Sequence, residues 1–313
     1  MKMKGILATT HLDAHGTRLA KEALEDMAAQ INSDSVPGVG SEHDILIPPQ
    51  GKVISASVVR MRDGEYALEG EQEIISPSRL SRVILPKGDI GYIDRYDDRR
   101  PFKDKYEETP EQNEISVDMV NFDSEKSAQE FITTIEQIEN QKAALLIRKS
   151  LIPDPEIIFR LSDEAIKWFL ATKAAKLLGN RISDDIAEDL HRLYKNIRDA
   201  SINYAALCLP KNRPITHVVV ISGKPTVECV IRTTDPVVFA EAVETNKLIE
   251  VIDSADEYHK KFKAQKIQFV YSEDKKAWAF NYLLTIEGSV VGSEIATKKR
   301  NKVIQMNRNK LKR

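Results

Sequence analysis

Hydrophobic positions in the first third of the chain change from strand spacing to helix spacing and back. Residues 4–9 have the composition of a short strand, and residues 17–31 repeat apolar side chains every three or four positions, as an amphipathic helix does. Residues 52–61 and 65–75 flank an Asp-Gly pair at 63–64, which is typical of a tight β hairpin. The pattern predicts one helix followed by a β-rich unit.

A polar stretch and a long helix are expected next. Residues 96–113 are almost wholly polar and contain two prolines, which predicts a solvent-exposed loop. A short strand is expected at 114–120 and a helix over 124–148, and Ile-Pro-Asp-Pro at 152–155 interrupts the pattern. We place a domain boundary near residue 150.

The second half mixes both kinds of pattern. Two predicted helices, at 162–178 and 183–207, each start at a serine with Asp or Glu in the first turn. The remaining predicted elements are strands at 217–222 and 226–233, helices at 236–244 and 255–263 separated by an apolar stretch at 248–252, and a hairpin of 266–271 with 277–286.

These elements predict an α+β protein with three parts. The first is a β-rich domain over residues 1–150, and the second is a helical segment followed by an α+β domain over residues 151–297. A basic tail over residues 298–313 completes the chain.

Composition agrees with two globular domains. The chain has 313 residues, of which 42% are hydrophobic and 30% charged, and its net charge of −2 neither favours nor disfavours nucleic acid. No run approaches the ~20 apolar residues that a membrane-spanning helix needs, and the N-terminal residues lead into a strand pattern rather than a signal region. We therefore expect a cytoplasmic protein without a membrane partner. The oligomeric state, including a homo-oligomer, stays open.

Two cysteines, Cys208 and Cys229, lie in apolar surroundings without the Cys-x-x-Cys spacing of a zinc or redox site. We expect two buried free thiols. We predict no cofactor and no metal as the primary assignment.

The C-terminal tail is locally cationic, because no acidic residue follows Glu294. Such a segment can neutralise nucleic-acid phosphates, dock an acidic protein surface, or simply keep the chain soluble. Its basic residues are Lys298, Lys299, Arg300, Lys302, Arg308, Lys310, Lys312 and Arg313.

Several short motifs follow one another in the first half. The segment Gly-Ile-Leu-Ala-Thr-Thr-His-Leu-Asp-Ala-His-Gly at 5–16 precedes the predicted helix, Val-Pro-Gly at 36–38, Glu-His-Asp at 42–44, Gly-Lys-Val at 51–53 and the Asp-Gly hairpin. In order and spacing, roughly residues 4 to 131 resemble the prohead (capsid-maturation) proteases of tailed phages. The resemblance implies a β-barrel-like core, shared with herpesvirus assemblins, and a serine and a histidine that cut scaffold and capsid proteins.

The resemblance also implies roles for particular residues. His43 matches the catalytic histidine, and Glu114 matches an acidic strand residue that could orient it. The segment Lys-Gly-Asp-Ile-Gly-Tyr at 87–92 aligns with the nucleophile strand and has Asp89 where the family has its serine. Because a carboxylate cannot take over acyl transfer from that serine, this alignment predicts a protein without peptidase activity.

A second alignment keeps a nucleophile. It takes Ser116 as the serine and residues 96–113 as an inserted loop. A metal site is a further alternative, since oxygen and imidazole ligands suit Mg, Mn or Zn. Its ligands would be Asp13, His15, His43, Asp44, Asp89 and Glu114.

Two functions remain. The first is a protease-like protein that binds a polypeptide partner without cleaving it, in phage head assembly or in a host response to phage, with nucleic-acid contact through the tail. The alternative is an active serine endopeptidase of the prohead type that cleaves scaffold or partner proteins.

Overall fold

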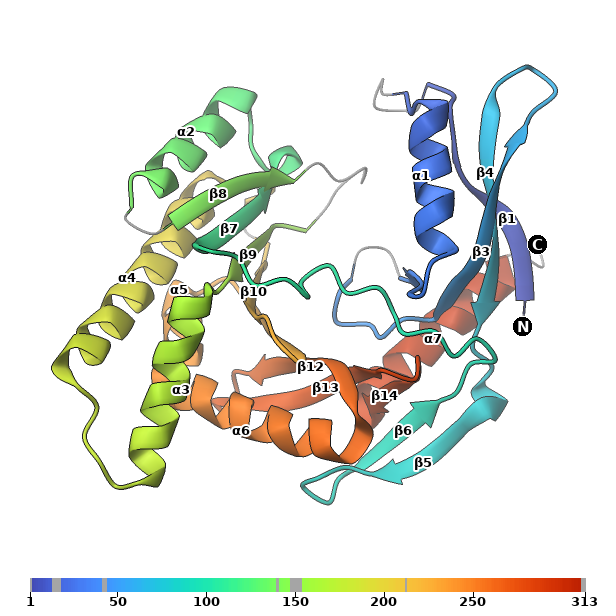
Figure 1. Ribbon diagram of the computed structural model, residues 1–313. Coiled ribbons are helices and arrows are strands. Elements are labelled where there is room, and N and C mark those ends of the chain that lie inside the picture. The colour runs from blue at the N-terminus through green and yellow to red at the C-terminus, as the bar shows by residue number, and fades with distance from the viewer. Residues whose placement is uncertain are drawn as a thin grey trace. The chain divides into compact units, whose positions relative to one another are not determined.

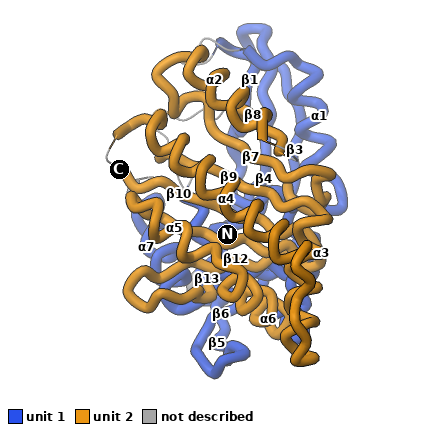
Figure 2. Tube along the Cα trace, turned by 90° about the vertical axis from the view of Figure 1, so that its left-hand side faces the viewer, with its two compact units in different colours: residues 1–104, 258–265, 281–313 blue, residues 105–257, 266–280 orange. Residues whose placement is uncertain are grey.

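Helices and strands both occur along the chain, often in runs of one kind, so the predicted α+β class is confirmed (Figure 1). The computed structural model describes residues 2–12, 18–40, 44–138, 141–146, 154–211 and 213–310, without the side chains of residues 77 and 308–310. By packing, the chain divides into two units (Figure 2). Unit 1 comprises residues 1–104, 258–265 and 281–313, and unit 2 comprises residues 105–257 and 266–280.

The first sheet of unit 1 contains the predicted hairpin. Its strand order is β1-β4-β3-β2, all antiparallel, with β1 (Lys2–Thr9), β2 (Gly38–Val39), β3 (Gly51–Arg60) and β4 (Tyr66–Ile74). Gly64 has a φ of +93° in the turn between β3 and β4, a conformation that glycine adopts without steric cost. Helix α1 (Lys21–Ile31) packs Leu24 and Ala28 against Val53 and Leu68 of this sheet.

The C-terminal helix packs on a second group of paired strands in unit 1. The order β5-β6-β14-β13 joins β5 (Leu80–Ile84), β6 (Ile90–Asp94), β14 (Val290–Ser293) and the last residues of β13 (Ala277–Thr285). A 3₁₀ turn (Pro77–Arg79) precedes β5. Helix α7 (Glu294–Lys310) packs on β6 and β14, and its Ile304 joins a core with Tyr282 and Val290.

The segment at 96–113 is a loop with mostly exposed polar residues, as its polarity predicts, but its aromatic residues are buried. It has no regular helix or strand before β7, yet Tyr96 and Phe102 are each only 2% exposed and their rings meet edge to face at 6.0 Å. The backbone of Val36 bonds on both sides of Phe102, accepting from Lys103 N–H and donating to the Pro101 carbonyl. Two buried aromatic side chains thus anchor a segment whose charged residues stay mostly exposed.

The paired strands of unit 2 combine parallel and antiparallel neighbours in the order β12-β11-β10-β9-β7-β8. The pairs β7–β8, β9–β10 and β11–β12 are parallel, and β7–β9 and β10–β11 are antiparallel. The strands are β7 (Asn113–Asp118), β8 (Gln141–Leu146), β9 (Glu156–Arg160), β10 (Ile215–Ile221), β11 (Thr226–Thr233) and β12 (Ala264–Ser272), of which β12 begins in unit 1.

The single helix predicted over 124–148 is wrong. Helix α2 (Glu125–Glu136) ends early, and Gln141–Leu146 forms β8, which pairs in parallel with β7. A parallel pair requires a crossover, and α2 supplies it. A 3₁₀ turn (Met119–Asn121) connects β7 to this helix.

Three helices of unit 2 begin as the sequence predicts. Ser124, Ser162 and Ser183 each accept a hydrogen bond from a backbone N–H in the first turn of α2, α3 (Asp163–Leu177) and α4 (Asp184–Leu207). The interruption predicted at 248–252 is absent, because α5 (Pro236–Ala242) is followed by one continuous helix, α6 (Thr245–Phe262). Across the described residues, no helix combines the length and apolarity needed to cross a membrane.

Candidate functional site

Asp89 lies in the turn between β5 and β6. The Leu85 N–H donates to the Asp89 carbonyl over 2.8 Å, which closes the turn, and the Asp89 residue is exposed. In the first alignment this turn is where the prohead proteases have their serine. A carboxylate at that position cannot act as the nucleophile of peptide acyl transfer.

Ser116 lies inside β7, where Glu114 occupies the same face two residues earlier. Ser116 Oγ donates to Glu114 Oε1 over 3.1 Å, and Glu114 Oε2 pairs with Arg160 Nη1 of β9 at 3.1 Å. Ser116 is only 4% exposed. Its hydroxyl is therefore buried and held by a carboxylate that a guanidinium already neutralises.

The histidine expected to act with these residues, His43, lies outside the described residues. Its neighbour Asp44 accepts a hydrogen bond from the Leu46 N–H at 3.1 Å, as a turn-forming aspartate does. Asp89 belongs to unit 1, whereas Glu114 and Ser116 belong to unit 2. The pairing of His43 with either candidate nucleophile stays a prediction.

The alternative metal site also depends on residues that the structure does not describe. Asp13, His15 and His43 lie outside the described residues. Within the described part of the chain, no group of three or more His, Cys, Asp or Glu side chains is arranged to hold a metal ion. Cys208 and Cys229 are both buried and free, as predicted, and burial raises the pKa of each thiol.

The basic tail is largely helical, because it forms most of α7. Lys298, Lys299 and Lys302 are exposed, and Lys298 pairs with Glu294 one turn earlier at 2.8 Å. Arg300 differs from them, since it is 1% exposed and pairs with the buried Asp94 of β6. The side chains of Arg308 and Lys310, and the residues Lys312 and Arg313, are outside the description.

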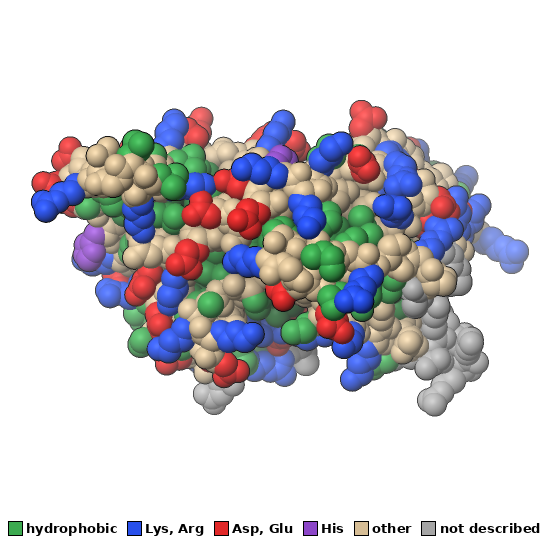
Figure 3. All heavy atoms as spheres, turned by 90° about the horizontal axis from the view of Figure 1, so that it is seen from below, with side chains coloured by type: hydrophobic (Ala, Val, Ile, Leu, Met, Phe, Trp, Pro, Cys, Tyr) green, Lys and Arg blue, Asp and Glu red, His purple; other side chains and the backbone are tan. Residues whose placement is uncertain are grey.

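Charge elsewhere on the surface is mixed. The face shown in Figure 3 intersperses Lys and Arg side chains with Asp and Glu side chains. This mixture matches the net charge of −2.

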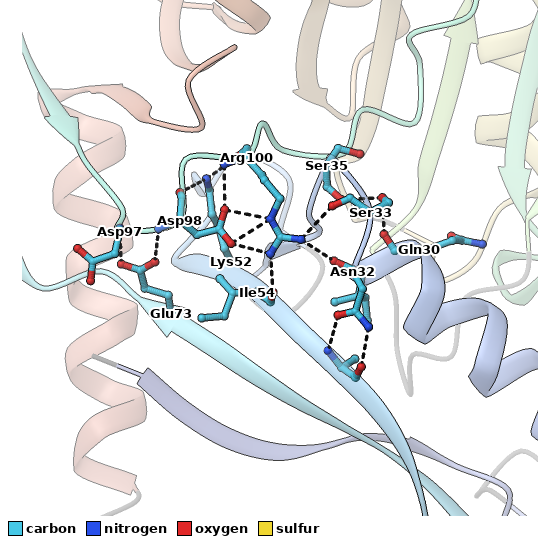
Figure 4. A network of polar contacts seen from close by, with 12 residues as sticks. Gln30, Asn32, Ser33, Ser35, Lys52, Ile54, Glu73, Asp97, Asp98 and Arg100 are labelled. Atoms are coloured by element: carbon cyan, nitrogen blue, oxygen red, sulfur yellow. Dashed lines mark hydrogen bonds and ion pairs between the residues drawn. The ribbon is translucent and has the colours of Figure 1, made fainter.

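A buried polar network in unit 1 was missed by the sequence analysis (Figure 4). Lys52 of β3 is 0% exposed, and its Nζ donates to the carbonyls of Asp98 and Arg100 at 2.8 and 2.5 Å. Arg100 pairs with Asp98 and also donates to the carbonyl of Ser33 at 2.9 Å. The buried carboxylate of Glu73 accepts the N–H groups of Asp97 and Asp98 at 2.8 and 3.1 Å. The network fixes the segment after β6 to β3 and β4.

The end of β1 carries a second polar cluster. Thr10 and Arg18 both donate to the Glu65 carboxylate, and Arg18 Nε also donates to the Thr10 carbonyl at 2.9 Å. Next to them, His11 Nε2 lies 2.9 Å from an Asp63 carboxylate oxygen, and this contact lowers the pKa of Asp63. Thr10, Arg18, Glu65 and Tyr66 line an open hollow of about 440 Å³. The unit thus presents a polar recess at the end of β1.

A serine and a histidine do meet in unit 2, but inside the core. Ser201 Oγ lies 2.7 Å from His217 Nε2, and the two residues are 1% and 2% exposed. The His217 ring stacks on Phe239 at 4.2 Å, and burial lowers its pKa to about 4. Since neither residue reaches solvent, the pair joins α4 to β10 rather than acting on a substrate.

Comparisons of the chain with protein-family models, with curated proteins and with solved structures return no match.

Proposed function

We propose that this protein binds a polypeptide through a prohead-protease-like, β-barrel-like first domain and does not cleave it. The setting is cytoplasmic and phage-related, either head assembly or a host response to phage. The resemblance of the motif order in the first half supports the setting. The state of the two candidate nucleophiles, Asp89 and Ser116, supports binding over cleavage.

The observation that carries the proposal is the state of the two candidate nucleophiles. Asp89 is an exposed carboxylate in a turn, and Ser116 is a buried hydroxyl bonded to Glu114. A serine peptidase needs a hydroxyl that both a base and the scissile carbonyl can reach. Neither residue offers such a hydroxyl.

The edge strand β1 is the surface that we assign to the polypeptide. Among the described strands β1 pairs only with β4, so one side of its backbone is available to an added strand. Lys2, Lys4 and Ile6 are exposed along it, and Ile6 is 56% exposed. These three residues share one face of β1, so they favour an extended partner segment with acidic side chains at two alternate positions and an apolar side chain at the third.

The test is to purify the full chain with the proteins encoded beside it, and to measure co-elution and intact masses together. We expect a neighbour to co-elute without new cleavage products. The double variant Lys2→Glu/Lys4→Glu should lose this co-elution, because it repels an acidic strand. Lys142→Glu is the matched control, since Lys142 is an exposed lysine on the edge strand β8 of unit 2.

Active-site variants separate the two functions. Cleavage products that disappear in both His43→Ala and Ser116→Ala would overturn the proposal and establish the endopeptidase. Co-elution that both variants preserve supports the binding protein.

Nucleic-acid contact through α7 is a second candidate function, favoured by the exposed lysines at 298, 299 and 302. Binding through these groups should weaken steeply as salt rises, because it releases counterions from the phosphates. We expect Lys299→Glu/Lys302→Glu to reduce the slope of log affinity against log salt by about two for a DNA duplex. Affinity that does not depend on salt would exclude this contact.

Removing the tail is a poor test of the same idea. Truncation after Thr297 would also remove Arg300 and Ile304, which are 1% and 2% exposed in the core of unit 1. Charge reversal of exposed lysines leaves that core intact.

A further inference from the structure

Unit 2 contains a cavity that no part of the proposed function uses. It has a volume of about 590 Å³ and lies where the end of α3, the first half of α4, α5 and the start of α6 meet. A cavity of this size is typical of sites for small organic molecules. All of its lining residues belong to unit 2.

The cavity wall is mainly aliphatic. Leu190 of α4 and Val243 after α5 are 4% and 1% exposed and contribute to it, together with Ile182. Ala187 and Ala240 also line the space, and their short side chains leave it open. The wall therefore suits the apolar body of a ligand.

The polar groups around the cavity are mostly cationic. His191, Lys195 and Arg198 lie at four- and three-residue intervals on α4 and share one face, and Lys176 adds a cation from α3. The only carboxylate in the lining described is Glu244. The lining thus has three permanent cations and one carboxylate, and Asp199 outside the lining pairs with Arg198, so the remaining positive charge makes an anionic group the complementary one.

Two of these cationic side chains, Lys176 and Arg198, have hydrogen-bond partners. Lys176 Nζ donates to the Asn246 side-chain oxygen at the start of α6, and Arg198 bonds to the neighbouring Asp199 at 3.2 Å. Tyr194 also lines the cavity, and burial raises the pKa of its phenol, so it stays a neutral hydrogen-bond donor.

We propose that this cavity binds a small amphipathic anion, with its apolar body between α4 and α5 and its acidic group at Lys195 and Arg198. The inference rests on the volume, the aliphatic wall and the charge of the rim. It is independent of polypeptide binding at β1, so either proposal can fail alone.

Two naphthalene dyes of nearly the same shape test it on the full chain. 8-Anilinonaphthalene-1-sulfonate carries the acidic group, and N-phenyl-1-naphthylamine lacks it. Fluorescence titration should show one saturable site for the sulfonate, with an affinity about tenfold higher than that of the neutral dye. Lys195→Glu/Arg198→Glu should remove this tenfold preference while the neutral dye still binds.

The second experiment fills the cavity with a larger side chain. Ala187 is exposed on α4, so Ala187→Trp should fold and should weaken the binding of both dyes. Arg192→Glu is the control for the charge variant, because it reverses one cation of α4 outside the cavity lining. The proposal is overturned if neither dye binds, if Ala187→Trp leaves both affinities unchanged, or if Arg192→Glu removes the preference as fully as the double variant does.

Discussion

Lys52 shows what a single residue contributes to unit 1. Its ammonium group is buried between the carbonyls of Asp98 and Arg100 and lies 4.8 Å from the centre of the Phe102 ring. A side chain at Gly288, whose φ is +69°, would begin 2.2 Å from Lys52 Nζ, so only glycine fits there. Burial lowers the pKa of Lys52 to about 8, although the nearby carboxylates of Asp98 and Glu73 oppose this shift.

This pKa gives the unit a definite pH dependence. Between pH 8 and the ordinary lysine value of 10.5, the unfolded chain binds a proton at Lys52 that the folded chain has released. Folding stability should therefore rise with pH across that window, by on the order of 2–3 kcal/mol at most. Urea unfolding at pH 7.5 and pH 9.5 measures the gain.

The matched variants are Lys52→Met and Lys142→Met. The first should lose the gain between the two pH values, whereas the second removes an exposed lysine and should keep it. A gain of equal size in Lys52→Met would show that another group causes the pH dependence.

At the scale of elements, α7 is anchored by an ion pair rather than by apolar contacts alone. Arg300 pairs with Asp94 of β6, and both residues are 1% exposed. Burial raises the pKa of Asp94, and the Arg300 guanidinium opposes that shift. An uncompensated charge at either position would be costly.

We expect Arg300→Met to lower the free energy of unfolding by about 3–5 kcal/mol, because it leaves Asp94 buried without its partner. Arg300→Met/Asp94→Asn should recover a large part of this loss. The measurement is chemical denaturation of the three chains at pH 7. A single variant as stable as the unchanged chain would show that the pair does not hold α7 in place.

Residues close in sequence determine where these helices begin, whereas a strand distant in sequence determines where α2 ends. Ser124, Ser162 and Ser183 cap their helices through bonds to residues three positions later, and such short-range chemistry can be predicted from sequence. The end of α2 depends on β7, because residues 141–146 become a strand only by pairing with it. The hydrophobic spacing of one long helix and that of a short helix followed by a buried strand are similar, so the sequence alone does not separate them.

For the whole molecule, the division into units changes the interpretation of the candidate site. The resemblance covers roughly residues 4 to 131, but unit 1 draws its residues from 1–104 and from two segments after residue 257. Glu114 and Ser116 fall in unit 2, in a strand where Arg160 neutralises the carboxylate. Polypeptide binding at β1 and anion binding in unit 2 are accordingly tested by separate variants.

The sequence by itself determined the α+β class, the Asp-Gly hairpin, the serine caps and the buried free thiols, because each follows from spacing or chemistry within a few residues. Tertiary structure alone decided that Arg300 is buried while Lys299 is exposed, that Lys52 is buried, and that Ser116 bonds to Glu114. The reason is physical: burial and ion pairing join residues as far apart as Asp94 and Arg300, and no local pattern encodes that contact.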